Sequence, residues 1–516
     1  MNIFSSIENK LELKFDNISN HPGIILLLLG IFGLGIRLIF LKWELPFGAD
    51  NFHYFQYAID LSIDQKLPTM LEVSNDGWPI FLSPFFSIFH SENFLDYMNL
   101  QRLISSIISV ITIIPIYLLS KQFVEKKYAI IAVALFAFEP RLIQNSLFGI
   151  SDPLYILAIT FAMYFLISRN EKFTVIAFGL IAFASIIRAE GLLLLPAFSI
   201  IYFLTHRKKK NIFQFILLIA IFFIIIAPIA ELRTQTIGQD NLTNRIVGGA
   251  GTIMKESNND VNFIIDGLST TIRFFGLSML PYFVFFVPFG CLLILKNRKK
   301  EHWSLFILSI FIIIPALYAY SREFLDVRYL FPLYPIYCII GTIGIMYIIK
   351  KIKFKKIFVT GIFSSIFILA VLFLVIQDID LKHEGEALSL AFVVSNKTST
   401  IFQYVPESQY INTVDYFNNS KFPDSSSNIK NTIPTLLNLR GINFDSIDEY
   451  IQYGRSKGLT HIVIDDSERR PESFKQVFNN EKDFPFLQKE YDSIDNGYEY
   501  NLKIFRIDYV MFDAKD

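Results

Sequence analysis

The sequence predicts a mainly α-helical, polytopic membrane protein that ends in a separate extracytoplasmic α/β domain. Of its 516 residues, 53% are hydrophobic and only 18% are charged, whereas soluble domains usually carry about 25% charged residues. The apolar residues fall in long runs up to position 376, after which the composition becomes polar. These observations indicate a membrane domain followed by a domain outside the bilayer.

The apolar runs predict about eleven membrane-spanning helices, since one span needs about 20 mostly apolar residues. Two of the runs are short and are separated only by Arg188-Ala189-Glu190, and a further short run at 78–90 is expected to be half-inserted or interfacial. The eleven runs are 23–41, 99–120, 128–145, 152–168, 173–187, 191–205, 211–229, 277–295, 303–320, 329–349 and 357–376. The first run lacks a small-residue cleavage site, so we expect it to remain as a signal anchor.

Positive charge in alternate loops sets the expected orientation. Five short loops carry 18 Lys and Arg residues, and such loops face the cytoplasm. They hold Lys121, Lys126, Lys127, Arg169, Lys172, Arg207 to Lys210, Lys296, Arg298, Lys299, Lys300, Lys350, Lys351, Lys353, Lys355 and Lys356. We therefore expect an integral protein of the cell membrane with a cytoplasmic N-terminus at 1–22, a membrane domain at 23–376 with outer loops 42–98 and 230–276, and an extracytoplasmic domain at 377–516.

The polar C-terminal segment contains both helix and strand signals. Ser446 to Lys457 predicts a helix that Gly458 ends, Thr460 to Ile464 predicts a buried strand, and Tyr498 to Val510 alternates like another strand. We find no catalytic constellation there, so a structural or acceptor-binding role is expected.

Composition excludes or weakens several other functions. The formal net charge is zero, which gives no reason to expect a nucleic-acid partner. The two cysteines, Cys291 and Cys338, lie inside apolar runs, which favours packing over a disulfide or metal pair.

Ionisable residues gather at the outer side of the expected topology, and such groups beside a membrane cavity often mark a site. The alternative is that helix ends carry polar residues in any case. The set contains Asp50, Glu139, Arg141, Asp152, Arg188, Glu190, Glu231, Arg233, Arg322, Asp326 and Arg328.

Asp50 is the candidate around which we expect the reaction to occur. In a helix, Asp50, His53 and Tyr54 would share one face by their i, i+3, i+4 spacing. A carboxylate at the mouth of a membrane cavity could act as a general base, with its pKa raised by burial. The alternative is that Asp50 only caps a helix beginning at Asn51.

Two acidic segments follow. Asp152-Pro153 fits a helix N-cap with proline in the first turn. That explanation does not cover Glu139 and Arg141, which we expect to pair with each other or with a ligand.

The remaining candidates are basic or aromatic. Arg188, Arg322 and Arg328 could hold a phosphate by forked hydrogen bonds, beside Glu190 and Tyr329. The alternative is interfacial placement or an internal ion pair such as Asp326 with Arg328.

Taken together, these segments resemble the GT-C superfamily of polytopic glycosyltransferases that use lipid-phosphate-linked sugars. The chain is most similar to the branch of protein O-mannosyltransferases and the lipid A aminoarabinose transferase, over roughly residues 20–350. The resemblance is carried by Asp50 to Tyr54, Ser151-Asp152-Pro153-Leu154, Arg188-Ala189-Glu190-Gly191, and Arg328-Tyr329 with Pro332 and Pro335.

The chain also departs from the family pattern. In the first loop that pattern is usually Asp-Glu, two residues, then Tyr, often preceded by Arg. Here Asn51 replaces the Glu and His53 stands where Arg is common, which leaves open the substrate and the tuning of the base. The tryptophans are Trp43, Trp78 and Trp303, so there is no Trp-Trp-Asp-Tyr-Gly motif, which argues against an oligosaccharyltransferase catalytic subunit.

The resemblance implies inverting transfer of a sugar from a polyprenyl-phosphate donor to an acceptor hydroxyl of a protein, lipid or glycan outside the cytoplasm. Asp50 would be the general base, and an arginine would stabilise the departing lipid phosphate. The other expected substrate contacts are His53, Tyr54, Glu139, Arg141, Asp152, Arg188, Glu190, Arg322, Arg328 and Tyr329. The resemblance requires no metal, although a divalent ion bridged by Asp50 and Asp152 stays an alternative.

Other interpretations remain open. The outer loop 230–276, with Gly248 to Gly251, would be a mobile cover over the site or only a flexible turn. The main rival function is a transporter or flippase for a lipid-linked glycan, although such proteins tend to place charges near the midplane within paired repeats. A third is a non-catalytic scaffold that displays the outer domain.

Overall fold

The computed structural model divides into two compact units, which we call the membrane unit and the C-terminal unit. The membrane unit comprises 1–41, 53–88 and 100–377, and the C-terminal unit comprises 42–52, 89–99 and 378–516. Two parts of the expected outer loop 42–98 thus cluster with the C-terminal unit. The structure describes residues 21–68, 76–168, 171–205, 211–238, 240, 244, 247–249, 251, 262–297, 299–378, 380–397, 402–404, 410, 413–414, 446–467 and 470–515.

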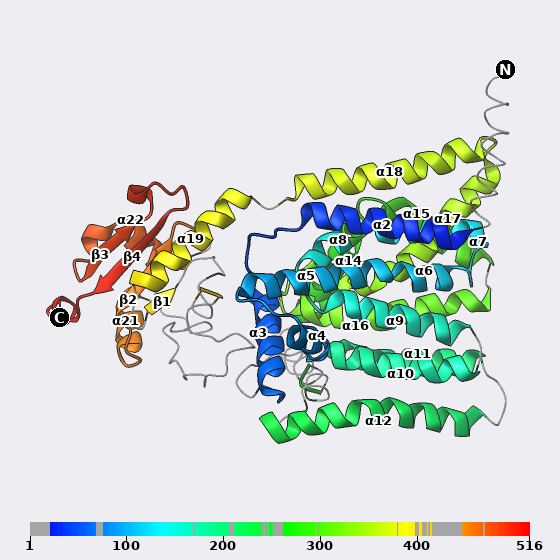
Figure 1. The fold of residues 1–516 in the computed structure, drawn as a ribbon, viewed down its shortest axis with the longest axis horizontal. Helices are drawn as coiled ribbons and strands as arrows, with labels where there is room; N and C mark the ends of the chain where they lie inside the picture. The colour runs from blue at the N-terminus through cyan, green and yellow to red at the C-terminus, as the bar shows by residue number, and fades with distance from the viewer. Residues whose placement is uncertain are drawn as a thin grey trace, which may run out of the picture. The chain divides into compact units, whose positions relative to one another are not determined.

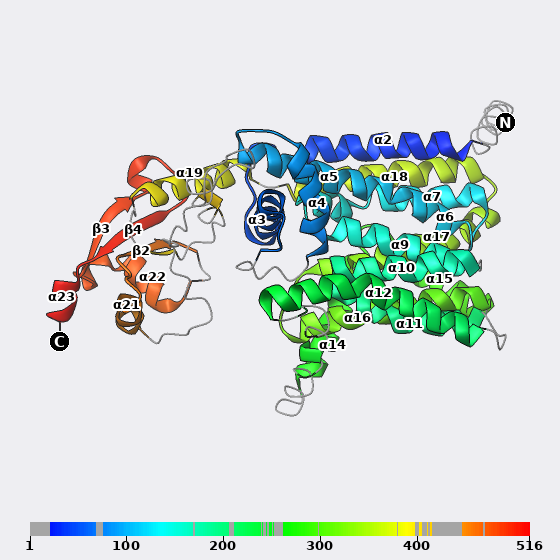
Figure 2. The ribbon, with the colours of Figure 1, turned by 60° about the horizontal axis from the view of Figure 1, so that its bottom comes forward.

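The membrane unit is a bundle in which most helices run alongside one another (Figures 1 and 2). Its principal contacts join α9 to α10, α10 to α12, α15 to α17, and α7 to α17. The helices are α2 (Pro22–Phe40), α3 (Ala49–Asp64), α4 (Gly77–Ile88), α5 (Phe94–Ile111), α6 (Ile113–Ser120), α7 (Lys126–Ala137), α8 (Pro140–Leu147), α9 (Asp152–Ile167), α10 (Glu171–Ile187), η1 (Ala189–Leu193), α11 (Leu194–Thr205), α12 (Asn211–Ile237), α14 (Asn262–Ser278), α15 (Phe283–Asn297), η2 (Lys300–His302), α16 (Trp303–Ser321), η3 (Val327–Leu333), α17 (Tyr334–Lys351) and α18 (Lys355–Ile376).

Several helices can cross a membrane. Within the described residues, six are long and apolar enough, and eight spans result if each of two bent helix pairs counts as one. The expected spans at 152–168, 173–187 and 191–205 correspond to the shorter apolar helices α9, α10 and η1–α11. The chain is therefore a polytopic helical protein, and the count of eleven stays a prediction.

The expected span at 128–145 is broken rather than straight. α7 and α8 meet at an angle of 50°, because Pro140 cannot continue the helix that precedes it. The buried guanidinium of Arg37 fills the break from α2: its Nη1 donates to the carbonyls of Gly33 and Ala137 at 2.8 and 3.2 Å. The Nη2 and Nε atoms of the same guanidinium donate to the hydroxyls of Ser109 and Ser146, at 2.9 and 3.1 Å respectively.

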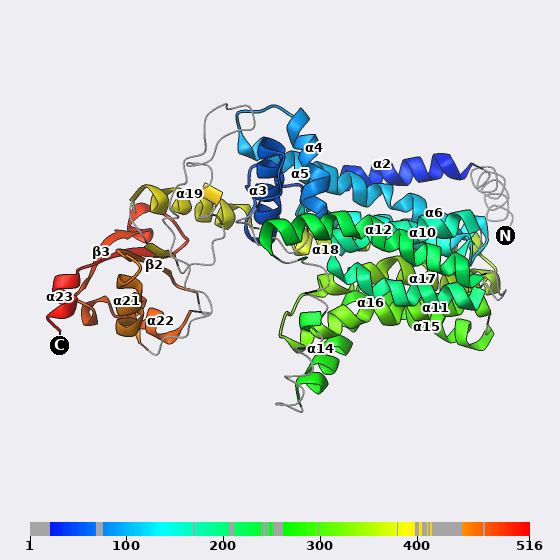
Figure 3. The ribbon, with the colours of Figure 1, turned by 90° about the horizontal axis from the view of Figure 1, so that it is seen from below.

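A second bend falls inside the expected span 277–295. α14 and α15 form an angle of 106°, so α14 points away from α15 while it packs against α16 (Figures 2 and 3). Residues 277 and 278 thus end α14 rather than begin α15.

The C-terminal unit contains a four-stranded sheet in the order β1-β2-β4-β3. β1 is parallel to β2, whereas the β2–β4 and β4–β3 pairs are antiparallel. Around it lie short helices (Figure 1). The elements are α19 (Leu381–Lys397), β1 (Phe402–Tyr404), α21 (Ile447–Arg455), β2 (His461–Asp465), α22 (Glu472–Asn479), η4 (Glu481–Asp483), β3 (Leu487–Asp492), η5 (Ile494–Asn496), β4 (Leu502–Ile507) and α23 (Tyr509–Asp513).

Local signals determined these elements well. Ser446 caps α21 by accepting from the Glu449 amide, and Gly458 adopts a φ of +82° soon after the helix ends, which glycine tolerates without a steric penalty. All five residues of β2 are buried, as the apolar run predicts. The expected strand at 498–510 is shorter, because β4 ends before α23 begins.

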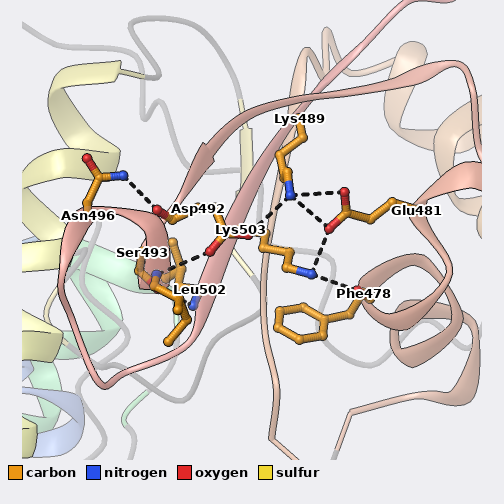
Figure 4. A network of polar contacts seen from close by, with 9 residues as sticks. Phe478, Glu481, Lys489, Asp492, Ser493, Asn496, Leu502 and Lys503 are labelled. Carbon is orange, nitrogen blue, oxygen red and sulfur yellow. Dashed lines mark hydrogen bonds and ion pairs between the residues drawn. The ribbon is translucent and has the colours of Figure 1, made fainter.

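Two apolar layers hold the sheet, one on each face. Ile462 and Ile464 pack with Ile451 and Val477, whereas Val463 belongs to a layer with α19. At one edge, Glu481 bridges Lys489 of β3 and Lys503 of β4, with N–O distances of 3.1 and 2.7 Å (Figure 4). These ion pairs hold η4 against the sheet, and we assign them a structural role.

Candidate active site

Arg188 lies where the helix α10 stops and the tighter helix η1 starts. Its backbone is extended, with φ −145° and ψ 126°. A Cβ on Gly191 would lie 2.7 Å from the Ser185 amide nitrogen, so only glycine lets η1 fold back against the last turn of α10. The Arg-Ala-Glu-Gly segment therefore forms a sharp break that turns the arginine side chain inward, where it is 11% exposed.

Two carboxylates hold the Arg188 guanidinium. Nη1 lies 2.5 Å from Asp152 Oδ1, and Nη2 lies 3.1 Å from Glu190 Oε1. The ring of Tyr155, one turn beyond Asp152 on α9, lies 5.9 Å from the guanidinium carbon. The arginine is thus held between α9 and η1 by charge-assisted hydrogen bonds.

The expected capping role of Asp152 is wrong in detail. Ser151 is the N-cap of α9, and Asp152 is the first helical residue, followed by Pro153 in the first turn. Because its side chain binds Arg188 from this position, Asp152 contributes an ion pair rather than a cap. The same carboxylate was one half of the alternative metal bridge.

A pocket opens beside this arginine. The empty space at this pocket amounts to about 350 Å³, a figure that includes open solvent. Its lining residues come from α9, η1, α11, α16 and η3: Tyr155, Arg188, Glu190, Leu194, Phe311, Ile312, Pro315, Arg328, Tyr329 and Pro332. Together these five elements bring two arginines and two tyrosines to one cavity.

The second arginine comes from the 3-10 helix η3. Asp326 caps η3 by accepting from the Arg328 amide at 2.9 Å, and its carboxylate also lies 3.1 Å from Arg328 Nε. The expected Asp326–Arg328 ion pair is therefore present, yet Arg328 still lines the pocket. Tyr329 packs edge-on against Tyr320, with ring centroids 6.1 Å apart.

Chemically, the pocket combines cationic forks with an apolar wall. Two guanidinium groups can each offer paired N–H donors to a phosphate. The proline and phenylalanine side chains exclude water from one side, and a mostly apolar pocket with a few convergent polar groups is typical of a ligand site.

Asp50, His53 and Tyr54 lie on one helix, as expected. α3 begins at Ala49, so Asp50 lies in its first turn rather than capping a helix at Asn51. Tyr54 is 8% exposed, whereas His53 is exposed.

Glu139 and Arg141 form a separate cluster at the α7–α8 break. Their side chains lie 3.8 Å apart, which matches the expected mutual pair. Arg141 donates to the Leu280 carbonyl and stacks over the Phe373 ring, 4.8 Å from its centroid. Neither residue lines the pocket around Arg188.

Two further expectations have different outcomes. Arg322 is outside the pocket lining and donates to the Tyr318 hydroxyl at 3.3 Å. Of the cover expected at 230–276, residues 239, 241–243, 245–246, 250 and 252–261 lie outside the described residues, and its role stays a prediction. Within the described chain, no group of three or more His, Cys, Asp or Glu side chains is arranged for a metal ion.

Sequence reasoning missed Tyr155 and the buried Asp76–Arg233 pair. Tyr155 follows Asp152 by three residues, a helical spacing that places both on one face. Its position beside Asp152 could therefore have been predicted from the expected helix. Asp76 and Arg233 are 157 positions apart in the sequence, and both oxygens of Asp76 accept from the arginine. No local signal connects two residues at that separation.

Comparison with known proteins finds a family model that matches part of the chain. Residues 79–230 match the family model described as dolichyl-phosphate-mannose-protein mannosyltransferase. This segment contains α4 through most of α12, including Asp152 and Arg188. No curated protein matches the chain.

Solved structures match over most of the length. The structure of ArnT from Cupriavidus metallidurans bound to undecaprenyl phosphate has 10% identity and a TM-score of 0.57, over 93% of this chain and 97% of that chain. The Archaeoglobus fulgidus oligosaccharyltransferase in the apo form has 12% identity and a TM-score of 0.57, over 86% of this chain and 69% of that one. AglB from Archaeoglobus fulgidus, in complex with an inhibitory peptide and a dolichol-phosphate, has 13% identity and a TM-score of 0.53, over 86% of this chain and 69% of that chain.

Proposed function

We propose that this chain, a membrane glycosyltransferase of the GT-C family, transfers one sugar from a polyprenyl-phosphate donor to an acceptor hydroxyl on the extracytoplasmic face. The family is indicated by the mannosyltransferase model and by the fold of ArnT and AglB. Those two structures contain undecaprenyl phosphate and a dolichol-phosphate, respectively. They support a lipid-phosphate donor for this chain.

The observation that carries the proposal is the pocket with Arg188 and Arg328. A polyprenyl-phosphate sugar presents one phosphodiester next to a long apolar tail. The two guanidinium groups suit the phosphate, and the apolar side of the pocket, with Phe311, Pro315 and Pro332, suits the adjoining lipid. Buried pairing to Asp152 and Glu190 keeps Arg188 oriented before the donor arrives, which reduces the cost of ordering it on binding.

The reaction is a single displacement with inversion. The acceptor oxygen forms a bond to the anomeric carbon, and the bond from that carbon to the phosphate oxygen breaks. Asp50 accepts the acceptor's proton, and the lipid phosphate leaves with the bonding electrons. Arg188, Arg328 or Arg322 stabilises the charge that develops on that phosphate.

The other polar candidates have supporting roles in this proposal. His53 and Tyr54 position the sugar or the acceptor, and Tyr329 forms a wall of the donor pocket. Asp152 and Glu190 hold the arginine. Glu139 and Arg141, which form their own cluster, contact the substrate only secondarily.

The orientation belongs to the same proposal. Eleven spans, with the 18 loop cations inside, would place the N-terminus in the cytoplasm and the segment 377–516 outside. That segment then serves a structural or acceptor-binding role. No metal takes part in the proposed step.

The test uses purified protein in vesicles with a labelled polyprenyl-phosphate hexose. Wild type should release the sugar, and Arg188→Lys, which keeps the charge but loses the fork, should release it at least tenfold more slowly. Arg273→Lys, an exposed arginine on α14, should behave as wild type. Movement of intact donor across the bilayer without release would instead identify a lipid-linked glycan flippase.

A further inference from the structure

The start of α4 is wedged between the two chain segments that carry Asp152 and Arg188. A Cβ built on Gly77 would lie 2.7 Å from backbone atoms of Ile186 and Ile187. Real Cβ atoms essentially never approach so closely, so any other residue at 77 must push back the end of α10. Arg188 is the next residue along that chain.

The neighbouring Trp78 contacts the other segment. Its indole Nε1 donates to the Gly149 carbonyl at 2.8 Å, and Gln101 Nε2 donates to the same oxygen at 2.7 Å. Gly149 has a φ of +67°, the left-handed region that glycine adopts without strain. Trp78 is fully buried, so the turn that leads into Asp152 is held from one side by a rigid ring.

A buried ion pair anchors the wedge itself. Asp76 accepts both of its arginine hydrogen bonds from Arg233 of α12, whose side chain is 0% exposed. The Arg233 guanidinium also lies 5.4 Å from the ring centroid of Tyr57 on α3. Asp76, Gly77 and Trp78 therefore contact α12, the end of α10 and the turn before α9 in three consecutive residues.

From this geometry we propose that Asp76-Gly77-Trp78 is a positioning wedge that sets the separation of Asp152 and Arg188, and through it the affinity of the pocket for a lipid phosphate. The inference rests on the proposed function for its ligand but not for its geometry. None of the three residues lines the pocket, so they act through Arg188 and Asp152 and are not catalytic residues.

The physical reason is the sensitivity of the Arg188–Asp152 contact. The two groups come from separate chain segments, the start of α9 and the break after α10, and meet at 2.5 Å. A misplacement of about 1 Å in a positioned site can cost about 100-fold in catalytic rate, and a charge-assisted hydrogen bond that is lost costs about 1.5–3 kcal/mol, which is about 10- to 100-fold in an equilibrium constant. Gly77 limits how far the end of α10 stands from the α4 backbone, and Trp78 fixes the turn opposite.

The first experiment measures binding of undecaprenyl phosphate to the purified full-length protein in detergent, with Tm recorded for every variant. Gly77→Ala should weaken binding about 10- to 100-fold, the range expected when a charge-assisted hydrogen bond such as Arg188–Asp152 is lost. Trp78→Phe keeps an aromatic but smaller ring and loses one of two donors to Gly149, so it should weaken binding only about two- to fivefold, as a single neutral hydrogen bond suggests. Gly35→Ala in α2, where a Cβ meets no atom within 4 Å, should bind as wild type.

A double-mutant cycle separates positioning from general damage. If Gly77 acts through Arg188, then Gly77→Ala should change the affinity less than twofold in an Arg188→Lys background. Independent, multiplicative effects of the two substitutions would overturn the proposal.

A third measurement is independent of the ligand. Hydrogen–deuterium exchange of peptides covering 149–152 and 187–190 should rise in Gly77→Ala and stay unchanged in Gly35→Ala. If wild type does not bind undecaprenyl phosphate, the proposed function fails, and the exchange data alone decide the wedge. Unchanged exchange in both peptides would refute it.

Discussion

Arg188 forms ion pairs with two carboxylates and also lines a pocket, and this double role has a physical basis. An isolated buried charge is costly, whereas one paired and hydrogen-bonded at 2.5 and 3.1 Å is tolerated. Asp152 holds the guanidinium from α9, and Glu190 holds it from η1. The pair therefore orients the arginine as well as neutralising it.

Asp152→Asn tests this role. We expect a loss of about 1–3 kcal/mol in stability, because one charge-assisted hydrogen bond is lost while Glu190 still pairs with the arginine. Tm in detergent is the measurement, and the affinity for undecaprenyl phosphate should fall with it. An equal Tm in wild type and mutant would argue against the pairing.

Arg37 is a second buried arginine, with a purely structural explanation. It donates to the last carbonyl of α7 and to two serine hydroxyls, so it satisfies acceptors that the helix break leaves open. Arg37→Leu should cost about 1–3 kcal/mol, because those acceptors lose their donor inside the bundle. Thermal unfolding checks this, with Ile39→Val, on a side chain that is 78% exposed, as a control expected to match wild type.

At this scale the sequence identified candidate side chains but not most of their contact partners. Arg188, Glu190 and Asp152 were identified as candidates from charge at helix ends, and the structure brings them together. Arg37 lies in an apolar run, and Asp76 pairs with a residue 157 positions away. Those contacts are set by tertiary packing, which periodicity and capping signals do not encode.

The helix α3 carries a pH-sensitive carboxylate. Burial, then the charge of Asp64 one turn away, raises the pKa of Asp60 to about 6. An acid whose folded pKa exceeds its unfolded value binds more protons when folded, so this group makes the protein less stable as pH rises from about 4 to 6.

Asp60→Asn should therefore raise the free energy of unfolding at pH 7.5 by on the order of 2 kcal/mol, and Tm should rise with it. The difference from wild type should shrink as pH falls toward about 4 and vanish below it, where the carboxyl is neutral in both the folded and the unfolded state. Thermal unfolding between pH 4 and 8 measures it, and a difference that grows toward low pH would contradict the account.

Whole elements were predictable where the signal is local. α21 and β2 follow from a serine cap, a left-handed glycine and an unbroken apolar run. The bends at α7–α8 and α14–α15 were not predicted, because an apolar run has the same composition whether the helix is straight or kinked. Pro140 marked the first bend. The carbonyl of Ala137 that this bend leaves open is tolerated because Arg37 donates to it.

For the molecule as a whole, the loop charges predict an orientation that labelling can test. In a background without Cys291 and Cys338, single cysteines at Lys126 and Asp495, both exposed, report the two sides. A membrane-impermeant maleimide added to intact cells should label Asp495→Cys and leave Lys126→Cys unlabelled until the membrane is opened. Labelling of Lys126→Cys in intact cells would show that the orientation is the opposite of the predicted one.

The fold class, the helical membrane domain and the family resemblance were all accessible from sequence, because long apolar runs and loop charge are strong signals. The shape of the pocket was not, since it needs residues from α9, η1, α16 and η3 at once. The segments 42–52 and 89–99 also cluster with the C-terminal unit, a grouping that no local pattern marks.

The most direct test of the central claim compares wild type with Asp50→Asn in sugar release from a labelled polyprenyl-phosphate hexose. Tm is recorded in parallel, and Asp266→Asn, an exposed carboxylate on α14, is the matched control. We predict release by wild type and by the control, and a loss of at least 100-fold in an equally stable Asp50→Asn, as expected when a general base is removed. Equal release by Asp50→Asn and wild type would contradict the assignment of Asp50 as the base.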